Sequence, residues 1–202
     1  MNPTQRAVAA RATSLLLRYP DTEVLATLPI LSAALDELPA TVAAALQLLA
    51  EHRAGTEPTS LASEYVELFD FRRRCCLHLT YYTCGDTRRR GEALVSFAAA
   101  YRLAGLELTG GELPDFLPAV LDLAAADALG WRLLREHRIG VDLLAQALAA
   151  EQSVYQHAAE AVRALLPPPG ASELAAAAGL ACSGPPREEV GLEPYPSPGG
   201  RR

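Results

Sequence analysis

Apolar residues recur at helical spacing along the first 165 residues of this chain. Side chains three, four and seven positions apart share one face of an α-helix, so the pattern predicts helices through most of the chain. Prolines and glycines separate the segments, because proline stops or kinks a helix. The expected helices cover residues 3–19, 22–38 (kinked or split at Pro29), 41–53, 58–69, 87–104, 114–126, 131–137 and 141–165, the last with a break around Ser153.

One segment breaks this pattern. Residues 77–83, with the sequence LHLTYYT, alternate between apolar and polar side chains and are rich in β-forming types. Taken alone, the segment is typical of a β-strand. No other segment offers a pairing partner, so we interpret it as an irregular loop or a helix end. The fold class predicted for the chain is all-α, with about seven or eight helices in one domain.

The composition changes after Leu166. Residues 167–202 hold eight of the fifteen prolines and six of the fourteen glycines. Such segments stay extended or disordered because they bury too little apolar surface to offset chain entropy. We therefore predict a helical domain over residues 1–166 and a largely disordered, flexible tail over 167–202, with one short Ala-rich helix at residues 172–181.

Charge and composition exclude several function classes. The net charge of −6 argues against a nucleic-acid binder, which needs a positive surface. All 18 basic residues are Arg, so a phosphate loop or Schiff base that depends on Lys is excluded. The apolar run at residues 15–17 is too short for a signal peptide, and no uncharged stretch reaches the roughly 20 residues of a membrane span. We expect a cytoplasmic protein without membrane insertion.

An acid followed closely by three arginines occurs twice, at Asp70 to Arg74 and at Asp86 to Arg90. Asp86 with Arg90, and Arg88 with Glu92, have the i, i+4 spacing of helical ion pairs. One interpretation is a set of salt bridges that ties two helix ends together. The other is a guanidinium cluster that recognises a carboxylate or phosphate. The spacing does not distinguish the two.

Thiol and imidazole groups lie between these elements, at Cys75, Cys76, His78 and Cys84. Their spacing is not the paired form of structural zinc sites, so buried thiols are the favoured interpretation over a metal site. The sequence also lacks a nucleophile elbow, a zinc-protease motif and a dinucleotide loop. We therefore predict a non-enzymatic protein without a cofactor, suited to binding a peptide or protein partner.

The two Arg elements around LHLTYYT, together with the following ELPDFLP, resemble the NarJ-type nitrate reductase assembly chaperones. These belong to the wider TorD/DmsD group of redox-enzyme maturation proteins. The resemblance covers about residues 60–165, and residues 188–194 are similar to a family tail. It implies an all-helical chaperone for the catalytic (alpha) subunit of respiratory nitrate reductase. Such a chaperone binds the apo-subunit, partly through its N-terminal leader-like segment, and keeps it competent for insertion of the molybdenum cofactor.

Two alternatives remain open on these residues. The chain could serve another molybdoenzyme, or it could be a small metalloprotein that uses its Cys and His residues. One departure from the family pattern is clear. The wider group usually has Pro-Asp-His where this chain has Pro114, Asp115 and Phe116, which puts the role of that imidazole in doubt. Oligomeric state is not predicted.

The candidate client site combines an apolar groove with acids that meet basic groups of a leader helix. We expect replacement of Asp115 by Ala to weaken leader binding without unfolding the domain. The groove candidates are Tyr65, Phe69, Tyr81, Tyr82, Leu113 and Leu117, and the acids are Asp70, Asp86 and Asp115. His78, Arg88, Arg89, Arg90, Pro114 and Pro118 complete the predicted client-binding set.

Overall fold

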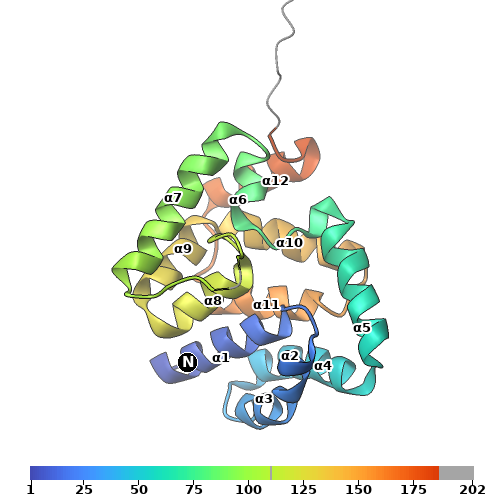
Figure 1. Ribbon diagram of the computed structural model, residues 1–202. Coiled ribbons are helices and arrows are strands. Elements are labelled where there is room, and N and C mark those ends of the chain that lie inside the picture. Colours follow the sequence, from blue (N-terminus) through green and yellow to red (C-terminus); the bar gives the residue numbers. More distant parts are fainter. Residues whose placement is uncertain (110, 187–202) are drawn as a thin grey trace, which may run out of the picture.

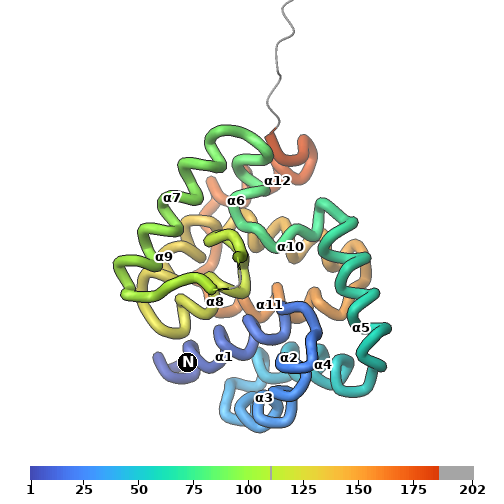
Figure 2. The backbone as a smooth tube through the Cα atoms, in the orientation of Figure 1, coloured from blue at the N-terminus to red at the C-terminus, as the bar shows by residue number. Residues whose placement is uncertain are grey.

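The computed structural model describes residues 1–109 and 111–186, and within them twelve α-helices form an all-α fold (Figures 1 and 2). The helices are α1 (Pro3–Leu16), α2 (Thr22–Ala26), α3 (Leu28–Leu35), α4 (Ala40–Gly55), α5 (Pro58–Tyr65), α6 (Leu79–Cys84), α7 (Arg88–Leu103), α8 (Leu117–Ala126), α9 (Ala128–Glu136), α10 (Arg138–Ala150), α11 (Gln156–Leu165) and α12 (Ala171–Ser183). A π-helix, η1 (Val66–Asp70), extends α5, and a 3-10 turn, η2 (Arg73–Cys75), follows it. The predicted fold class is confirmed.

The core is built from helices that are distant in sequence. α1 packs along α8 and also contacts α4 and α11, while α10 packs against α11, α6 and α12 (Figure 1). Large side chains from these helices have no solvent exposure, among them Leu16, Leu46, Leu121 and Val162. Burial of each contributes roughly 1.5–3 kcal/mol of hydrophobic free energy. The arrangement brings the end of α1 next to residues more than a hundred positions later.

The helices outnumber the seven or eight expected because two long apolar segments are interrupted, and because α6 and the later helix α12 add two more. The second expected helix splits into α2 and α3, and Pro29 takes a place in the first turn of α3, where its missing N–H costs nothing. The last one splits into α10 and α11 around Ser153, beside Gln152 at a φ of 53°. Side chains of both parts still face one core, which is why the apolar period continued across the break.

The alternating segment is mostly helical. His78 forms an isolated antiparallel bridge with Phe116, and α6 begins at the next residue. The amide of Leu79 donates to the carbonyl of Asp115 at 3.0 Å, and the amide of Leu117 donates to the carbonyl of Leu77 at 2.8 Å. Within this segment only His78 pairs as a β-bridge. Its pairing partner, which the sequence alone did not reveal, is Phe116 of the ELPDFLP stretch.

Two expected helix starts are shifted. α7 begins at Arg88, one residue later than expected, because Thr87 is the N-cap residue; the Thr87 hydroxyl donates to the carbonyl of Cys84 at 2.7 Å. α8 begins at Leu117 rather than at residue 114, since the backbone at 115 and 116 is engaged in the bridge and Pro118 fits the first helical turn.

The described part of the Pro/Gly-rich segment contains a helix close to the one predicted. α12 packs against α10, with Ala177 buried. The backbone of Pro186 lies so close to Gly85, which has a φ of +57°, that a β-carbon at Gly85 would overlap its carbonyl. The family-like residues 188–194 lie outside the described residues, and the domain boundary at 166 stays a prediction. None of the helices described here has the length and apolar character needed to span a bilayer.

Candidate functional site

A cavity of about 670 Å³ opens between the C-terminal end of α1, α2, the α5–η1 segment and the start of α8. In Figure 1, α1 and α2 (blue) lie in the lower part of the view, α5 lies at the right and α8 (yellow) lies left of centre. Residues 76–78 complete its wall together with Thr109, Glu112 and Phe116. The predicted site residues Tyr65, Phe69, Asp70 and His78 line this cavity, so segments from four parts of the chain meet here.

Aromatic side chains form the apolar part of the cavity. Tyr65, Phe69 and Phe116 are less than 10% exposed, whereas Tyr19 keeps 46% of its surface in solvent. Tyr65 packs edge-on against Tyr19 at 5.5 Å and tilted against Phe69 at 4.7 Å between ring centroids. Edge and tilted contacts are the favoured geometries of aromatic pairs. Tyr19 is therefore an exposed aromatic that rests on a fixed aromatic base.

The two arginines of the cavity share one carboxylate partner within the chain. Arg11 and Arg18 both approach the carboxylate of Asp122 on α8, at 2.6 and 2.7 Å. Asp21 is engaged as well, because its side chain accepts the amide of Val24 at 2.8 Å and caps α2. The contacts with Asp122 tie the end of α1 to α8.

Three carboxylates around the cavity remain available. Glu23, Asp70 and Glu112 line it and form no ion pair or hydrogen bond within residues 1–109 and 111–186. They come from α2, η1 and the loop before α8. An exposed set of unpaired carboxylates attracts basic groups, because charge-assisted hydrogen bonds to guanidinium or ammonium groups are the strong ones. The cavity thus combines aromatic surface with an excess of negative charge.

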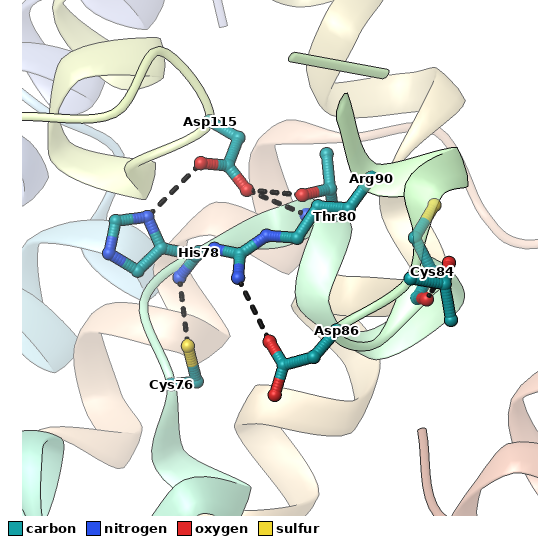
Figure 3. A network of polar contacts seen from close by, with 8 residues as sticks. Cys76, His78, Thr80, Cys84, Asp86, Arg90 and Asp115 are labelled. Atoms are coloured by element: carbon teal, nitrogen blue, oxygen red, sulfur yellow. Dashed lines mark hydrogen bonds and ion pairs between the residues drawn. The ribbon is translucent and has the colours of Figure 1, made fainter. Parts of the chain in front are cut away.

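His78 and Asp115 form a polar network on the cavity wall (Figure 3). The Asp115 carboxylate has no solvent exposure and lies 3.1 Å from Nδ1 of His78 through Oδ1. Its Oδ2 accepts the amide of Thr80 at 3.1 Å and the Thr80 hydroxyl at 2.5 Å. Burial raises the pKa of the Asp115 carboxyl, but the hydrogen bonds from His78 and Thr80 outweigh burial and hold the pKa below its ordinary value. Asp115 is thus a buried, ionised acid whose hydrogen-bond partners are His78 and Thr80 of the same chain.

Several predicted residues belong to the interior instead. Tyr82 is buried, and its hydroxyl donates to the carbonyls of Arg74 and Cys76 at 2.9 and 2.8 Å. Leu117 has no exposure, and the carbonyl of Pro118 accepts the Ser14 hydroxyl at 2.8 Å. These residues hold α6 and α8 in place and do not line the cavity. Tyr81, Leu113 and Pro114 lie outside its lining as well.

The two Arg elements differ in the structure. Asp86 pairs with Arg90 at 3.3 Å, as the i, i+4 spacing indicated. Asp70 does not pair with Arg74, since η1 ends there; Arg72 instead pairs with Glu151 at the end of α10. Arg89 lies on the surface outside the cavity lining, as does Arg88. Both ion pairs are salt bridges within the chain, but neither joins the two Arg elements to each other.

The thiols are buried or half-buried rather than activated. Burial raises the pKa of Cys75 to about 11 and also raises that of Cys76. The Cys76 sulfur accepts the amide of His78 at 3.5 Å. In the part of the chain that the structure describes, no group of three or more Cys, His, Asp or Glu residues is arranged to hold a metal ion.

Sequence reasoning missed the whole wall contributed by α1 and α2. Tyr19 is the last residue of the first expected helix, yet it lies beyond the end of α1 and is exposed. Glu23 and Glu112 carried no local signal, because an unpaired acid on a polar surface is ordinary. Only the contact between α1 and α8, about a hundred residues apart, brings these side chains to one cavity.

Comparison with known proteins identifies the class first through the fold. A crystal structure of a proposed redox enzyme maturation protein from Archaeoglobus fulgidus superposes with a TM-score of 0.58 over 78% of this chain and 91% of that one. At 21% sequence identity the likeness shows the fold alone. The two proteins therefore share one all-α fold.

The sequence comparison defines the family. The model of the nitrate reductase delta subunit family matches residues 35–164, and the chain belongs to this family. The chain is 34% identical to NarJ of Bacillus subtilis, over 77% of this chain and 86% of that protein. It is 38% identical to the nitrate reductase-like protein NarX of Mycobacterium tuberculosis over 77% of this chain, but spans only 24% of the length of NarX. The resemblance to NarJ-type chaperones is confirmed.

Proposed function

We propose that this protein is a dedicated cytoplasmic chaperone that binds the apo catalytic subunit of respiratory nitrate reductase. It keeps that subunit competent for molybdenum cofactor insertion and for assembly of the complex. Membership of the nitrate reductase delta subunit family supports a maturation role. B. subtilis NarJ, a relative of similar length, is assigned as a nitrate reductase molybdenum cofactor assembly chaperone.

The observation that carries the proposal is the chemistry of the cavity. Tyr19, Tyr65 and Phe116 offer aromatic surface, and unpaired carboxylates surround it. This combination suits an amphipathic helix that buries an apolar face and carries basic side chains beside it. The N-terminal leader-like segment of the catalytic subunit is the proposed occupant. A chaperone must release its client, so we expect a Kd near the micromolar range, about −8 kcal/mol.

Titration calorimetry tests the proposal. The full chain is titrated with a synthetic peptide of the first roughly fifteen residues of the catalytic subunit encoded with it, about four helical turns. We expect saturable binding with a negative heat-capacity change, which marks apolar burial. Binding should weaken as salt increases, since exposed charge pairs are screened. If the peptide does not bind at any of the salt concentrations tested, the proposed site is contradicted.

A pair of charge-matched variants locates the site. Asp70→Asn with Glu112→Gln removes two unpaired carboxylates of the cavity, and should weaken binding about threefold to tenfold. Asp36→Asn with Glu37→Gln removes the same two side-chain types from the exposed end of α3, away from the cavity. This control should bind like the wild type. Equal loss in both variants would indicate a general charge effect.

Stronger binding of a leader from another molybdoenzyme would point to that enzyme as the client.

A further inference from the structure

We propose that residues 187–195 of this chain dock along the exposed face of α7, with the paired acids Glu188 and Glu189 at the basic start of that helix. The apolar side chains that follow the two acids then cover the exposed apolar side chains of α7. This inference goes beyond the proposed function, because α7 does not line the cavity and the docking involves no client. It assigns an interaction surface and the segment that occupies it.

One face of α7 is apolar and open. Val95 is 64% exposed and Leu103 is 76% exposed, with the half-buried Ala99 midway between them. Side chains four positions apart share a helix face, so these three form one stripe. Gly91 lies one turn earlier on the same face, and no other described atom lies within 4 Å of a β-carbon built there. An exposed apolar stripe of this kind marks an interaction site.

The start of α7 is basic and lacks compensation from its own first turn. Arg88, Arg89 and Arg90 occupy that turn, which contains no acidic residue. The N-cap residue Thr87 makes no capping hydrogen bond through its side chain. Asp86 pairs with Arg90, while Arg88 and Arg89 are exposed. Because a helix N-terminus already carries partial positive charge, carboxylates brought to this turn are stabilised by the dipole and by the guanidinium groups.

The described chain delivers two acids to this place. The backbone of Pro186 packs against Gly85, which lies three residues before the first residue of α7. Figure 1 shows α12 beside the same end of α7. A chain spans at most about 3.6 Å per residue, so Glu188 and Glu189 lie within about 11 Å of Pro186. By the same limit Gly85 lies within about 11 Å of Arg88. The acids are therefore within reach of the basic turn.

The order of residues along the two segments also agrees. On α7 the basic turn comes first, and Val95 and Leu103 follow. After Pro186 the two acids come first, and the apolar residues that follow are Val190, Leu192 and Tyr195. The sixteen residues of α7 span about 24 Å, and residues 187–195 extend up to about 30 Å. A segment that runs along α7 from its start thus places acids on arginines and apolar side chains on the stripe.

The covalent link favours this segment over a second copy of the chain. A segment joined through a short link to its docking surface has an effective concentration in the millimolar range, which a separate molecule must exceed to compete. Copies of the chain also repel each other, since each carries a net charge of −6. Residues 187–195 are therefore the occupant that the charges and the position of Pro186 support.

Methyl NMR of the full chain tests the docking. At low salt, nuclear Overhauser cross-peaks should join the methyl groups of Val95 or Leu103 to side chains of residues 190–195. Arg88→Glu with Arg89→Glu should abolish these cross-peaks, because acids then face acids. The variant should keep α7, since acidic residues are favoured in a first helical turn. Adding Glu188→Arg with Glu189→Arg to that variant should restore the cross-peaks, because opposite charges meet again.

Arg132→Glu with Arg135→Glu is the matched control, because it makes the same change of charge at exposed positions of α9. It should keep the wild-type cross-peaks. Their absence from the wild type at low salt, or their persistence in Arg88→Glu/Arg89→Glu, would overturn the inference. Cross-peaks that arise only between copies, in a mixture of two differently labelled chains, would overturn it as well and assign the surface to a second copy. Client binding in the cavity is unaffected by any of these results.

Discussion

Asp115 shows how a residue singled out by its motif acquires its role from its partners. The sequence suggested an acid that meets the client directly. In the structure its carboxylate is fully buried and receives hydrogen bonds from His78 and from the amide and hydroxyl of Thr80. Removing it would leave buried donors without an acceptor, which costs more than a hydrogen bond on the surface. Asp115 therefore supports the fold from behind the cavity wall and does not itself line the cavity.

Replacement of Asp115 by Asn should lower the free energy of unfolding by about 2–3 kcal/mol, because a charged acceptor of buried hydrogen bonds is lost. Asp70→Asn, at an exposed acid without an ion pair in the described chain, should change it by less than about 0.5 kcal/mol. Urea denaturation of both variants at pH 7 measures the difference. Equal stability of the two would contradict the structural role of Asp115.

The depressed pKa of Asp115 also predicts a pH dependence of stability. A carboxyl whose folded-state pKa lies below its unfolded value stabilises the fold above the unfolded value, about 3.9. That contribution is lost as the pH falls through the folded-state pKa. The stability gap between wild type and Asp115→Asn should therefore be complete at pH 7 and shrink below about pH 4. Acid unfolding curves check this, and a gap that stays constant would contradict it.

At the residue scale, the sequence identified four of the cavity residues and missed most of the rest. Tyr65, Phe69, Asp70 and His78 stood out because they flank an unusual Arg-containing stretch. Tyr82 and Leu117 looked equivalent to them but are buried, since an apolar pattern does not distinguish a core face from a groove. Local patterns carry no information about contacts between α1 and α8, so the acidic wall at Glu23 remained hidden.

At the scale of the element, the end of α1 is the part that shapes the cavity. Arg53 on α4 is 1% exposed and donates to the carbonyls of Leu15, Leu16 and Arg18 at 2.8–3.0 Å. It satisfies the free carbonyls that every helix C-terminus leaves. Burial lowers the pKa of Arg53, and within the described residues no carboxylate forms an ion pair with it. Arg53 therefore acts as an internal cap that fixes the chain leading to Tyr19.

Arg53→Met should destabilise the protein by about 2–4 kcal/mol, because three buried or partly buried carbonyls lose the guanidinium donor while the aliphatic volume is kept. Arg135→Met on the exposed face of α9 serves as the control, with an expected change below about 0.5 kcal/mol. Thermal unfolding followed by circular dichroism compares the two. A loss in Arg53→Met no larger than in the control would show that solvent caps α1 equally well.

Elements were predictable where the apolar period was long. The positions of α1, α4, α7 and α8 follow from helical spacing to within a few residues. Boundaries failed where a side chain had a distant partner. α8 starts later than expected because the preceding residues form the bridge to His78, and α6 was obscured by an alternating composition. Tertiary contacts override local propensity at these points.

At the scale of the molecule, the chain combines a helical core with an acidic, aromatic cavity built from both halves of the sequence. The net charge of −6 adds to the local negative charge there, which favours encounter with a basic client segment. The wall of the cavity is complete only when α1, α2, η1 and α8 are all in place. Client recognition should therefore be a property of the folded whole and not of an isolated helix.

The central claim is that this chain matures the catalytic subunit of nitrate reductase through this cavity. The most direct measurement is the molybdenum content of that subunit, purified from cells that lack the chain and receive it back in variant form. We predict a metal-deficient, inactive subunit without the chain, full loading with the wild type and with Asp36→Asn/Glu37→Gln, and reduced loading with Asp70→Asn/Glu112→Gln. A fully loaded, active subunit in cells without the chain would contradict the account.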